Sequence, residues 1–382
     1  MTLLTEIANI KQLLNKDNQE SRMIVFYAES SIYYLYFEGF IKYILDNSEH
    51  IICYITSDPD DPVFKLQSER FKVLNISNTM LSYVTPMLDS KVFMMTMTDL
   101  GRYHIKRSSK NVNHIYVFHA ILSTHMVYTK GSFDNYDTIF CIGPYHVDEI
   151  RQTERHYGLK KKQLVEVGYP LLEKIHHDHE EFKKTHIPDP AQSTLVLIAP
   201  SWHTGNIVES CIDDLVLGLI KSGYKVVLRP HPETMKRNKG KIKAVVEKYE
   251  GESSFELDRS PASLKYFHAA DVLITDWSGI AFEYAFGTER PVLFINTPPK
   301  VHNNEFEKIN IEPVELKLRN EIGISMNTHN ISAASSETEK LLLNGDQFRD
   351  AIITCRSQYI YNWMSSAAAG GKYILNFVNK AV

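Results

Sequence analysis

The 382-residue chain has few cysteines, and none of them forms a CxxC pair. Its four cysteines lie far apart, each beside apolar residues: Cys53, Cys141, Cys211 and Cys355. This pattern is typical neither of a disulfide framework nor of a zinc site. We therefore expect four buried thiols and a reducing, cytoplasmic environment.

The sequence also has no long apolar run. Residues 1–6 lack the basic and apolar regions of a signal peptide, and no apolar run approaches the ~18 residues of a membrane span. We expect a soluble protein, associated at most with a membrane surface. The net charge of -4 disfavours a general nucleic-acid binder but leaves room for a local basic pocket.

Three motifs that would announce a particular chemistry are missing. The sequence contains no GxxxxGK[ST] loop and no GxSxG elbow, which disfavours a P-loop NTPase and a hydrolase triad. No DxD-type pair marks a metal-diphosphate site, because the acidic run at 58–61 contains a proline and is typical of a turn. We expect no cofactor and no protein-bound metal, although a requirement for a divalent metal stays open.

The first half of the chain predicts a parallel sheet after an N-terminal helix. Apolar residues at helical spacing in 1–20 predict one amphipathic helix that packs on the protein or on a second subunit. Residues 21–185 then alternate short apolar runs with helical stretches, as in a Rossmann-like domain. These runs are 23–27, 51–55, 92–95, 114–118 and 136–142. The charged run 176–184, followed by Pro188 and Pro190, predicts a linker.

The second half predicts a doubly wound α/β domain at 190–335. Five short apolar runs are the expected strands: 195–198, 225–228, 255–257, 272–274 and 291–295. Residues 336–382 are expected to be helical and to pack back on the N-terminal domain. The pair Gly370-Gly371 predicts a break between two helices.

Polar residues follow three of the expected strands in this second domain. Ligands of open parallel sheets bind at the carboxyl ends of strands, so these residues are candidates for a nucleotide-phosphate site. They are Ser201, Trp202, His203 and Thr204 after the first strand, Arg229 and His231 after the second, and Thr275, Asp276, Ser278 and Gly279 after the third.

The turn from strand to helix at 275–284 is suited to a phosphate. Gly279 permits close backbone approach, and Ser278 is a natural helix N-cap. A helix N-terminus offers free N–H groups and partial positive charge. Glu283, one turn later, is placed to accept hydrogen bonds from ribose hydroxyls. The competing interpretation is that Ser278 only caps the helix and Glu283 is exposed.

Arg229 and His231 form the second candidate pair. Arginine offers a planar fork to phosphate oxygens, and histidine can donate a hydrogen bond or a proton to a leaving phosphate. The alternative is a rigid turn, because Pro230 and Pro232 stiffen this loop.

The first domain offers His119, which lies where an expected strand meets a loop and is a candidate general base. The alternative is a histidine satisfied within the core. The nearby His125 fits a structural role better. Basic residues of the loop 96–109 either receive an anionic acceptor, together with His125, or form a solvated surface. They are Arg102, His104, Lys106 and Arg107.

These motifs resemble one known family. The carriers of the resemblance are His119, the sequence Gly168-Tyr169-Pro170, the sequence Arg229-Pro230-His231-Pro232, and the stretch 271–284. Together they resemble the CDP-glycerol glycerophosphotransferases, which build teichoic acids and related capsular polymers. The resemblance spans about residues 90–300.

The resemblance implies a GT-B fold, in which two Rossmann-like domains face a central cleft, followed here by a helical C-terminal segment. It implies transfer of glycerol phosphate from CDP-glycerol to a hydroxyl, with release of CMP. By resemblance, His119 is the catalytic base and His231 contacts the donor phosphates. Ser278 and its neighbours match the diphosphate loop, and Glu283 matches the ribose-binding carboxylate.

Three stretches depart from the family pattern. Phe118-His119-Ala120 stands for the usual Trp-His-Gly, Trp277-Ser278-Gly279 for Tyr-Ser-Ser, and Leu171-Leu172-Glu173 for Arg-Asn-Asp. The chain is therefore expected to be a divergent member.

The expected donor is CDP-glycerol or a related CDP- or UDP-linked compound, and the expected acceptor is a polymer or lipid-linked glycan at the inner face of the membrane. Two other functions stay open: a GT-B glycosyltransferase using a nucleotide-sugar, and a non-catalytic nucleotide-binding protein. The terminal helices leave a homodimer open as well.

Overall fold

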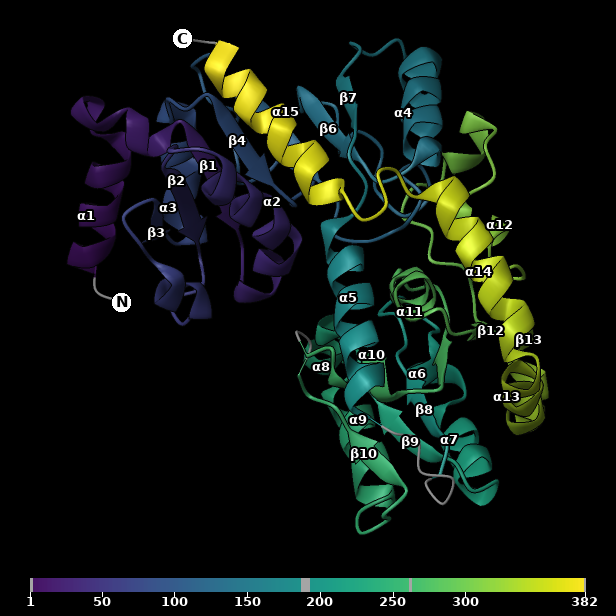
Figure 1. Cartoon of the computed structure of the whole chain (residues 1–382). Coiled ribbons are helices and arrows are strands. Elements are labelled where there is room, and N and C mark those ends of the chain that lie inside the picture. The colour runs from purple at the N-terminus through teal and green to yellow at the C-terminus, as the bar shows by residue number, and fades with distance from the viewer. Residues whose placement is uncertain (1–2, 187–192, 261–262, 381–382) are drawn as a thin grey trace.

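The computed structural model describes residues 3–186, 193–260 and 263–380, which contain two parallel β-sheets (Figure 1). The N-terminal sheet has the order β3-β2-β1-β4-β5-β6-β7. Its strands are β1 Ile24–Ala28, β2 Ile52–Thr56, β3 Phe71–Asn75, β4 Val92–Met95, β5 Asn113–Val117, β6 Thr138–Cys141 and β7 Gln163–Glu166.

The C-terminal sheet has the order β10-β9-β8-β11-β12-β13, again with parallel neighbours. Its strands are β8 Leu195–Ile198, β9 Lys225–Leu228, β10 Phe255–Leu257, β11 Val272–Thr275, β12 Val292–Asn296 and β13 Gly323–Asn327. In both sheets the strand order reverses beside the first strand, as doubly wound folds require. The predicted α/β architecture is therefore confirmed.

Helices cover both faces of each sheet because alternate strand residues are apolar on both sides. Ile24 and Phe26 of β1 face one core, with α2 and α15, whereas Val25 and Tyr27 face another, with α1 and α3. The N-terminal helices are α1 Leu3–Leu14, α2 Tyr34–Asn47, α3 Asn78–Val84, α4 Pro144–Tyr157 and α5 Pro170–Thr185.

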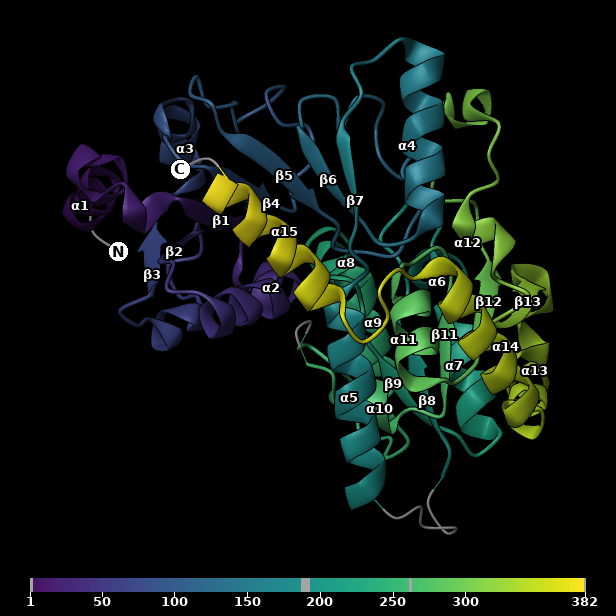
Figure 2. The same cartoon turned by 45° about the horizontal axis from the view of Figure 1, so that its top comes forward.

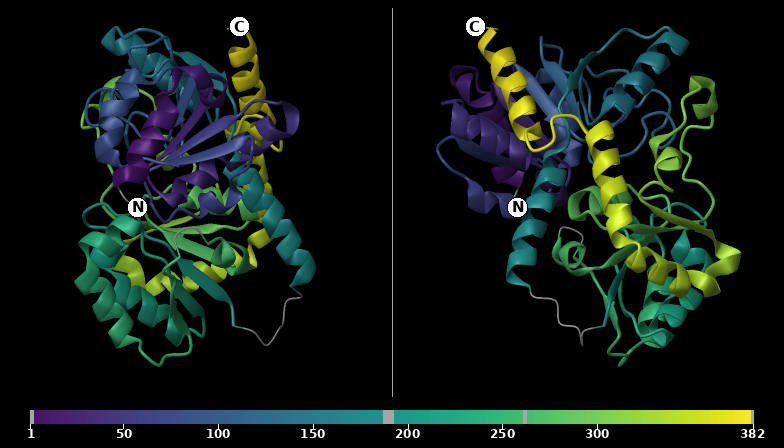
Figure 3. Two further views of the ribbon diagram at one scale, coloured as in Figure 1. Left: turned by 90° about the vertical axis from the view of Figure 1, so that its left-hand side faces the viewer. Right: turned by 45° about the vertical axis from the view of Figure 1, so that its right-hand side comes forward.

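The remaining helices pack on the C-terminal sheet or return to the first half (Figure 2). They are α6 Ile207–Ser210, α7 Ile212–Lys221, α8 Pro232–Arg237, α9 Lys239–Lys248, α10 Lys265–Ala269, α11 Ile280–Thr288, α12 Val314–Lys317, α13 Ala334–Leu343, α14 Gly345–Tyr359 and α15 Ser366–Lys380. Helices α5 and α14 both run between the two halves (Figure 3).

The predicted linker is wrong for residues 176–184, which form the second half of α5. Leu172 and Ile175 of this helix pack on Gly287 of α11, and His176 Nδ1 lies 3.1 Å from the Gly287 carbonyl oxygen. The charged residues form the outer face of the helix. Pro188 and Pro190 lie outside the described residues.

The N-terminal helix is shorter than predicted and ends at Leu14. It packs on the protein, as expected: Leu13 is buried, and the Asn9 amide donates to the Asn75 carbonyl at 2.9 Å. Leu3 and Leu4 are 67% and 79% exposed. Among the described residues, no helix combines the length and apolarity that a membrane crossing requires.

Three strands and one helix break differ from the sequence-based expectation. Strands β3, β7 and β13 lie outside the expected runs, because edge strands such as β7 are partly exposed and lack a continuous apolar run. Gly370 and Gly371 do not break a helix but lie inside α15, which packs on α2 as expected of the C-terminal helices. The four cysteines are buried and unpaired, as predicted.

Gly370 should be required for the packing of α15 on α2. A β-carbon on Gly370 would lie 2.3 Å from Phe40 Cε1 and 3.2 Å from Phe140, inside a packed aromatic core. We expect Gly370→Ala to lower the free energy of unfolding by about 1–3 kcal/mol, measured by urea denaturation.

Gly240 is the matched control, because it also lies in a helix, α9, but a β-carbon added to it would meet no atom within 4 Å. Gly240→Ala should be neutral or stabilising by up to ~1 kcal/mol. Equal effects of the two substitutions would contradict the packing role of Gly370.

Candidate functional site

The carboxyl ends of the two sheets meet at Gly279, the residue that precedes α11. A β-carbon added there would lie 3.0 Å from Ala120 Cβ and 3.2 Å from Leu122 Cγ. The loop after β5 therefore touches the loop after β11, and we call this contact the junction. The sequence predicts Ser278 as the cap of α11; Gly279 holds the N-cap position instead, without a side-chain hydrogen bond.

His119 lies on the N-terminal side of the junction, within a cage of tyrosine rings. Ring centroids of Tyr33, Tyr36 and Tyr128 lie 5.8, 6.0 and 6.5 Å from that of His119. Its Nδ1 has no hydrogen-bond partner among the described residues. Burial, with a contribution from the charge of Lys300, lowers the pKa of His119 to about 4. The ring is therefore neutral at pH 7 and able to accept a proton.

His231 lies on the C-terminal side, at the N-cap of α8. Its Nδ1 accepts a hydrogen bond from the Glu233 N–H at 3.1 Å, so the neutral ring carries its proton on Nε2. Burial, then the charge of Lys300, lowers its pKa to about 4. The charge of His119 also contributes to this shift. His119 precedes Ala120, which meets Gly279 at the junction, and His231 lies beside Trp202 on the C-terminal side.

Glu283 faces the same region from α11. Its Oε1 accepts a hydrogen bond from the Tyr169 hydroxyl at 2.7 Å, and the Tyr169 ring stacks on Tyr36 at 6.3 Å. Burial raises the pKa of Glu283 to about 7. The alternative that Glu283 is an exposed helix residue is therefore wrong.

Three predicted phosphate ligands have other partners. Arg229 Nε donates to Asp258 Oδ2 at 2.6 Å, and its Nη2 donates to the Ser263 carbonyl at 2.6 Å. Thr275 Oγ1 donates to the Ala199 carbonyl at 2.6 Å. Arg229 and Thr275 therefore stabilise the strand ends, and their binding of phosphate stays a prediction.

Asp276 is the third of these. Its carboxylate accepts hydrogen bonds from the backbone N–H groups of Ser201, Ile207 and Trp277 at 2.7–3.1 Å. The side chain ties the end of β11 to the loop after β8. A carboxylate whose oxygens already accept three backbone hydrogen bonds, and which repels anions, is unsuited to bind a phosphate.

The loop after β8 lies beside His231. The Trp202 ring lies 6.1 Å from the His231 ring and 5.4 Å from that of His302. Ser201 Oγ is buried and has no partner among the described residues, whereas His203 is buried with Nε2 3.3 Å from Thr297 Oγ1. Thr204 is exposed.

The basic loop after β4 does not form a single acceptor site. Arg107 pairs with Asp137 at 3.0 Å, before β6 begins and therefore at the opposite edge of the sheet from His119. Its predicted acceptor role is wrong, because the loop crosses the full height of the sheet. Arg102 pairs with Asp99 at 3.1 Å on the surface. His104 and Lys106 are exposed, as the solvated-loop alternative predicts.

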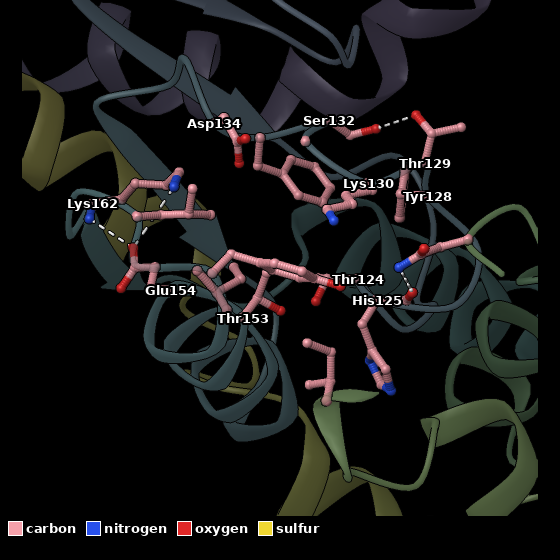
Figure 4. A pocket seen from close by; sticks show the side chains of 17 residues that line it. Thr124, His125, Tyr128, Thr129, Lys130, Ser132, Asp134, Thr153, Glu154 and Lys162 are labelled. Atoms are coloured by element: carbon pink, nitrogen blue, oxygen red, sulfur yellow. Dashed lines mark hydrogen bonds and ion pairs between the residues drawn. The ribbon is translucent and has the colours of Figure 1, made fainter. Parts of the chain in front are cut away.

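His125 has a structural role. Its Nε2 lies 2.9 Å from the Ile311 carbonyl oxygen, and its Nδ1 lies 3.5 Å from Glu149 Oε2, so it links the two halves. The residue also lines a cavity of about 70 Å³ between the loop 124–134 and α4 (Figure 4). Tyr128 lines the same cavity, and its ring contacts His119. The cavity and His119 are therefore separated by the Tyr128 side chain.

Two cations at the junction were not predicted from the sequence. Lys300 follows β12, and its Nζ lies 4.8 Å above the Trp202 ring centroid. Arg319 donates to the Asp276 carbonyl at 2.9 Å and stacks on Trp277 at 4.2 Å. The sequence analysis searched for polar residues after three strands of this domain. The same search after β12 would have found Lys300. No group of three or more potential metal ligands is clustered among the described residues.

Comparison with known proteins decides the family. The pattern of "CDP-Glycerol:Poly(glycerophosphate) glycerophosphotransferase" matches residues 19–300. The chain belongs to this family. It is 23% identical over 155 residues to the teichoic acid glycerol-phosphate primase of Bacillus subtilis (strain 168). That match spans 40% of this chain and 38% of the primase.

Solved structures show the same GT-B fold. The wall teichoic acid polymerase TagF superposes with a TM-score of 0.61 at 14% identity, over 99% of this chain and 95% of that chain. The UDP co-structure of S. aureus MnaA superposes with a TM-score of 0.59 at 12% identity, over 93% and 97% of the two chains. The GT-B architecture implied by the resemblance is therefore confirmed.

The junction contact gives a testable exchange. The resemblance predicts glycine at position 120 and serine at position 279, the reverse of the Ala120 and Gly279 of this chain, so either arrangement places a β-carbon on only one side of the contact. We expect Gly279→Ser to destabilise the protein by about 1–3 kcal/mol in urea denaturation, because it overpacks the contact. Adding Ala120→Gly should recover at least half of that loss.

Gly345→Ser is the control, because no atom lies within 4 Å of a β-carbon at Gly345. Its effect should stay within ~0.5 kcal/mol. Additive losses in the double variant would show that Ala120 and Gly279 do not oppose each other.

Proposed function

We propose that the chain transfers glycerol phosphate from CDP-glycerol to a hydroxyl of a cell-surface polymer precursor and releases CMP. The observation that carries this proposal is the contact of the two strand-end loops at Ala120 and Gly279, with the Nδ1 of His119, unpartnered among the described residues, on one side and His231, beside Trp202, on the other. Family membership supports the same reaction.

His119 would act as the general base. With its Nδ1 unpartnered among the described residues, the ring can take the proton of the acceptor hydroxyl, whose oxygen attacks the glycerol-bearing phosphorus in line. A new P–O bond forms to the acceptor, and the bond to the bridging oxygen of the diphosphate breaks, so CMP leaves with the electron pair.

His231 and the start of α11 would bind the diphosphate. His231 presents an Nε2–H that donates to a phosphate oxygen of the leaving CMP, and the free N–H groups of α11 favour negative charge there. The phosphate-binding set is then Ser278, Gly279 and His231, with Ser201 and Trp202 beside them. Glu283 would accept hydrogen bonds from the ribose hydroxyls once it is ionised.

The acceptor would be a teichoic-acid-type polymer or lipid-linked glycan at the cytoplasmic face of the membrane. The name of the Bacillus subtilis relative, a teichoic acid glycerol-phosphate primase, supports this substrate class.

Sugar transfer is the second candidate, favoured by the fold shared with the UDP co-structure of MnaA. The two reactions release different nucleotides, since breaking a sugar C–O bond frees a nucleoside diphosphate. Incubation with CDP-glycerol and with CDP- and UDP-linked sugars, followed by chromatography of the nucleotides, distinguishes them. We expect CMP from CDP-glycerol; release of CDP or UDP instead would refute phosphate transfer.

His119→Ala should lower turnover by about 10²–10⁴-fold while the affinity for CDP persists, because only proton transfer is lost. His104→Ala is the matched control, since His104 is exposed on the loop after β4, and its turnover should match wild type. Full activity of His119→Ala would exclude His119 as the base.

A further inference from the structure

The segment 297–300 is anchored at the junction. The Thr297 carbonyl accepts a hydrogen bond from Trp277 Nε1 at 2.8 Å, which ties the segment to the loop after β11. Pro298 packs 3.3 Å from the position of a β-carbon on Gly205, in the loop after β8. Lys300 is therefore held by two of the strand-end loops that surround His231.

Lys300 is half-buried, and its ammonium group has no direct counter-ion among the described residues. Among the described residues it makes no hydrogen bond or ion pair, and its one close contact is the Trp202 ring. Burial lowers its pKa to about 8, against the opposing influence of Asp276 and Glu315. A charge partly removed from water and without a partner is costly, so such a group is suited to bind an anion.

The two nearby carboxylates have other partners. Asp276 accepts three backbone N–H groups, and Glu315 Oε1 accepts from the backbone N–H and the hydroxyl of Ser123, at 2.8 and 3.1 Å. Neither forms an ion pair with Lys300. Both raise its pKa from a distance and thereby favour its charged form.

Trp202 links Lys300 to His231, because the Lys300 Nζ lies 4.8 Å and the His231 ring 6.1 Å from the Trp202 ring centroid. After burial, the charge of Lys300 is the next largest cause that lowers the pKa values of both His119 and His231, which come from different sheets. It also lowers the pKa values of His203 and His302. Arg229, the arginine among the residues predicted to bind phosphate, donates a hydrogen bond to Asp258 instead.

We propose that Lys300 binds the distal phosphate of the donor, the group that is transferred. The Trp202 ring holds the lysine side chain in place, and the ammonium donates hydrogen bonds to the non-bridging oxygens between His119 and His231. Charge that develops on these oxygens during in-line transfer then meets a fixed positive group. This assignment rests on the proposed function, of which it names one further substrate-binding residue.

The test compares CDP, which carries a distal phosphate, with CMP, which does not. Isothermal titration calorimetry on the full chain should show that Lys300→Met binds CDP about 10–100-fold more weakly than wild type, the loss of a charge-assisted hydrogen bond. CMP should bind both proteins equally. Lys300→Arg, which keeps the charge, should recover part of the CDP affinity.

Lys243→Met is the control for a lost positive charge, because Lys243 is exposed on α9 and pairs with Glu247 at 3.3 Å. It should bind CDP as wild type does. Unchanged CDP affinity in Lys300→Met, or an equal loss of CMP and CDP affinity, would overturn the assignment. If Lys300→Met does not fold, Lys300→Gln and Lys300→Arg give the same comparison.

The two proposals fail separately. If CDP-glycerol yields CMP while Lys300→Met binds CDP normally, the function stands and the Lys300 assignment is wrong. If CDP binding depends on Lys300 but no donor releases CMP, the assignment stands and the proposed reaction is wrong.

Discussion

The close contact between Gly279 and the Ala120–Leu122 loop is the constraint on which the candidate site depends. With no β-carbon at Gly279, the loop after β11 can touch the loop after β5. That contact brings the residue after His119 against the start of α11. Ala120 and Gly279, two of the positions at which the chain departs from the pattern that the resemblance predicts, meet in space.

Charges at the junction fall into two groups. Asp276, Arg229 and Arg319 hold strand ends together, and their polar atoms are engaged by backbone groups or by neighbouring side chains. Lys300 and the two neutral histidines have no direct counter-ions among the described residues. Lys300 therefore remains as an available positive group beside two neutral histidines, in a chain whose net charge is -4.

The sequence predicts what local pattern determines. Apolar runs identify the central strands, and the strand-end rule finds His119, His231 and Glu283 because parallel strands deliver their carboxyl ends to one edge. The same rule fails where the position or partner of a side chain depends on a residue far away in the sequence. Asp258 follows β10 and takes Arg229, a pairing that no spacing reveals. Arg107 lies far from the site because its loop crosses the sheet, and Gly370 fits a helix because Phe40 packs on it.

The most direct test of the account is an NMR titration of the imidazole signals of His119 and His231, assigned with His119→Gln and His231→Gln. Burial disfavours the charged rings, so both should titrate near pH 4, and His119→Gln should raise the pKa of His231 because a neighbouring positive charge is removed. Midpoints near 6.5, with His231 unaffected by the loss of His119, would show that the two rings are solvated and do not share the space between the sheets.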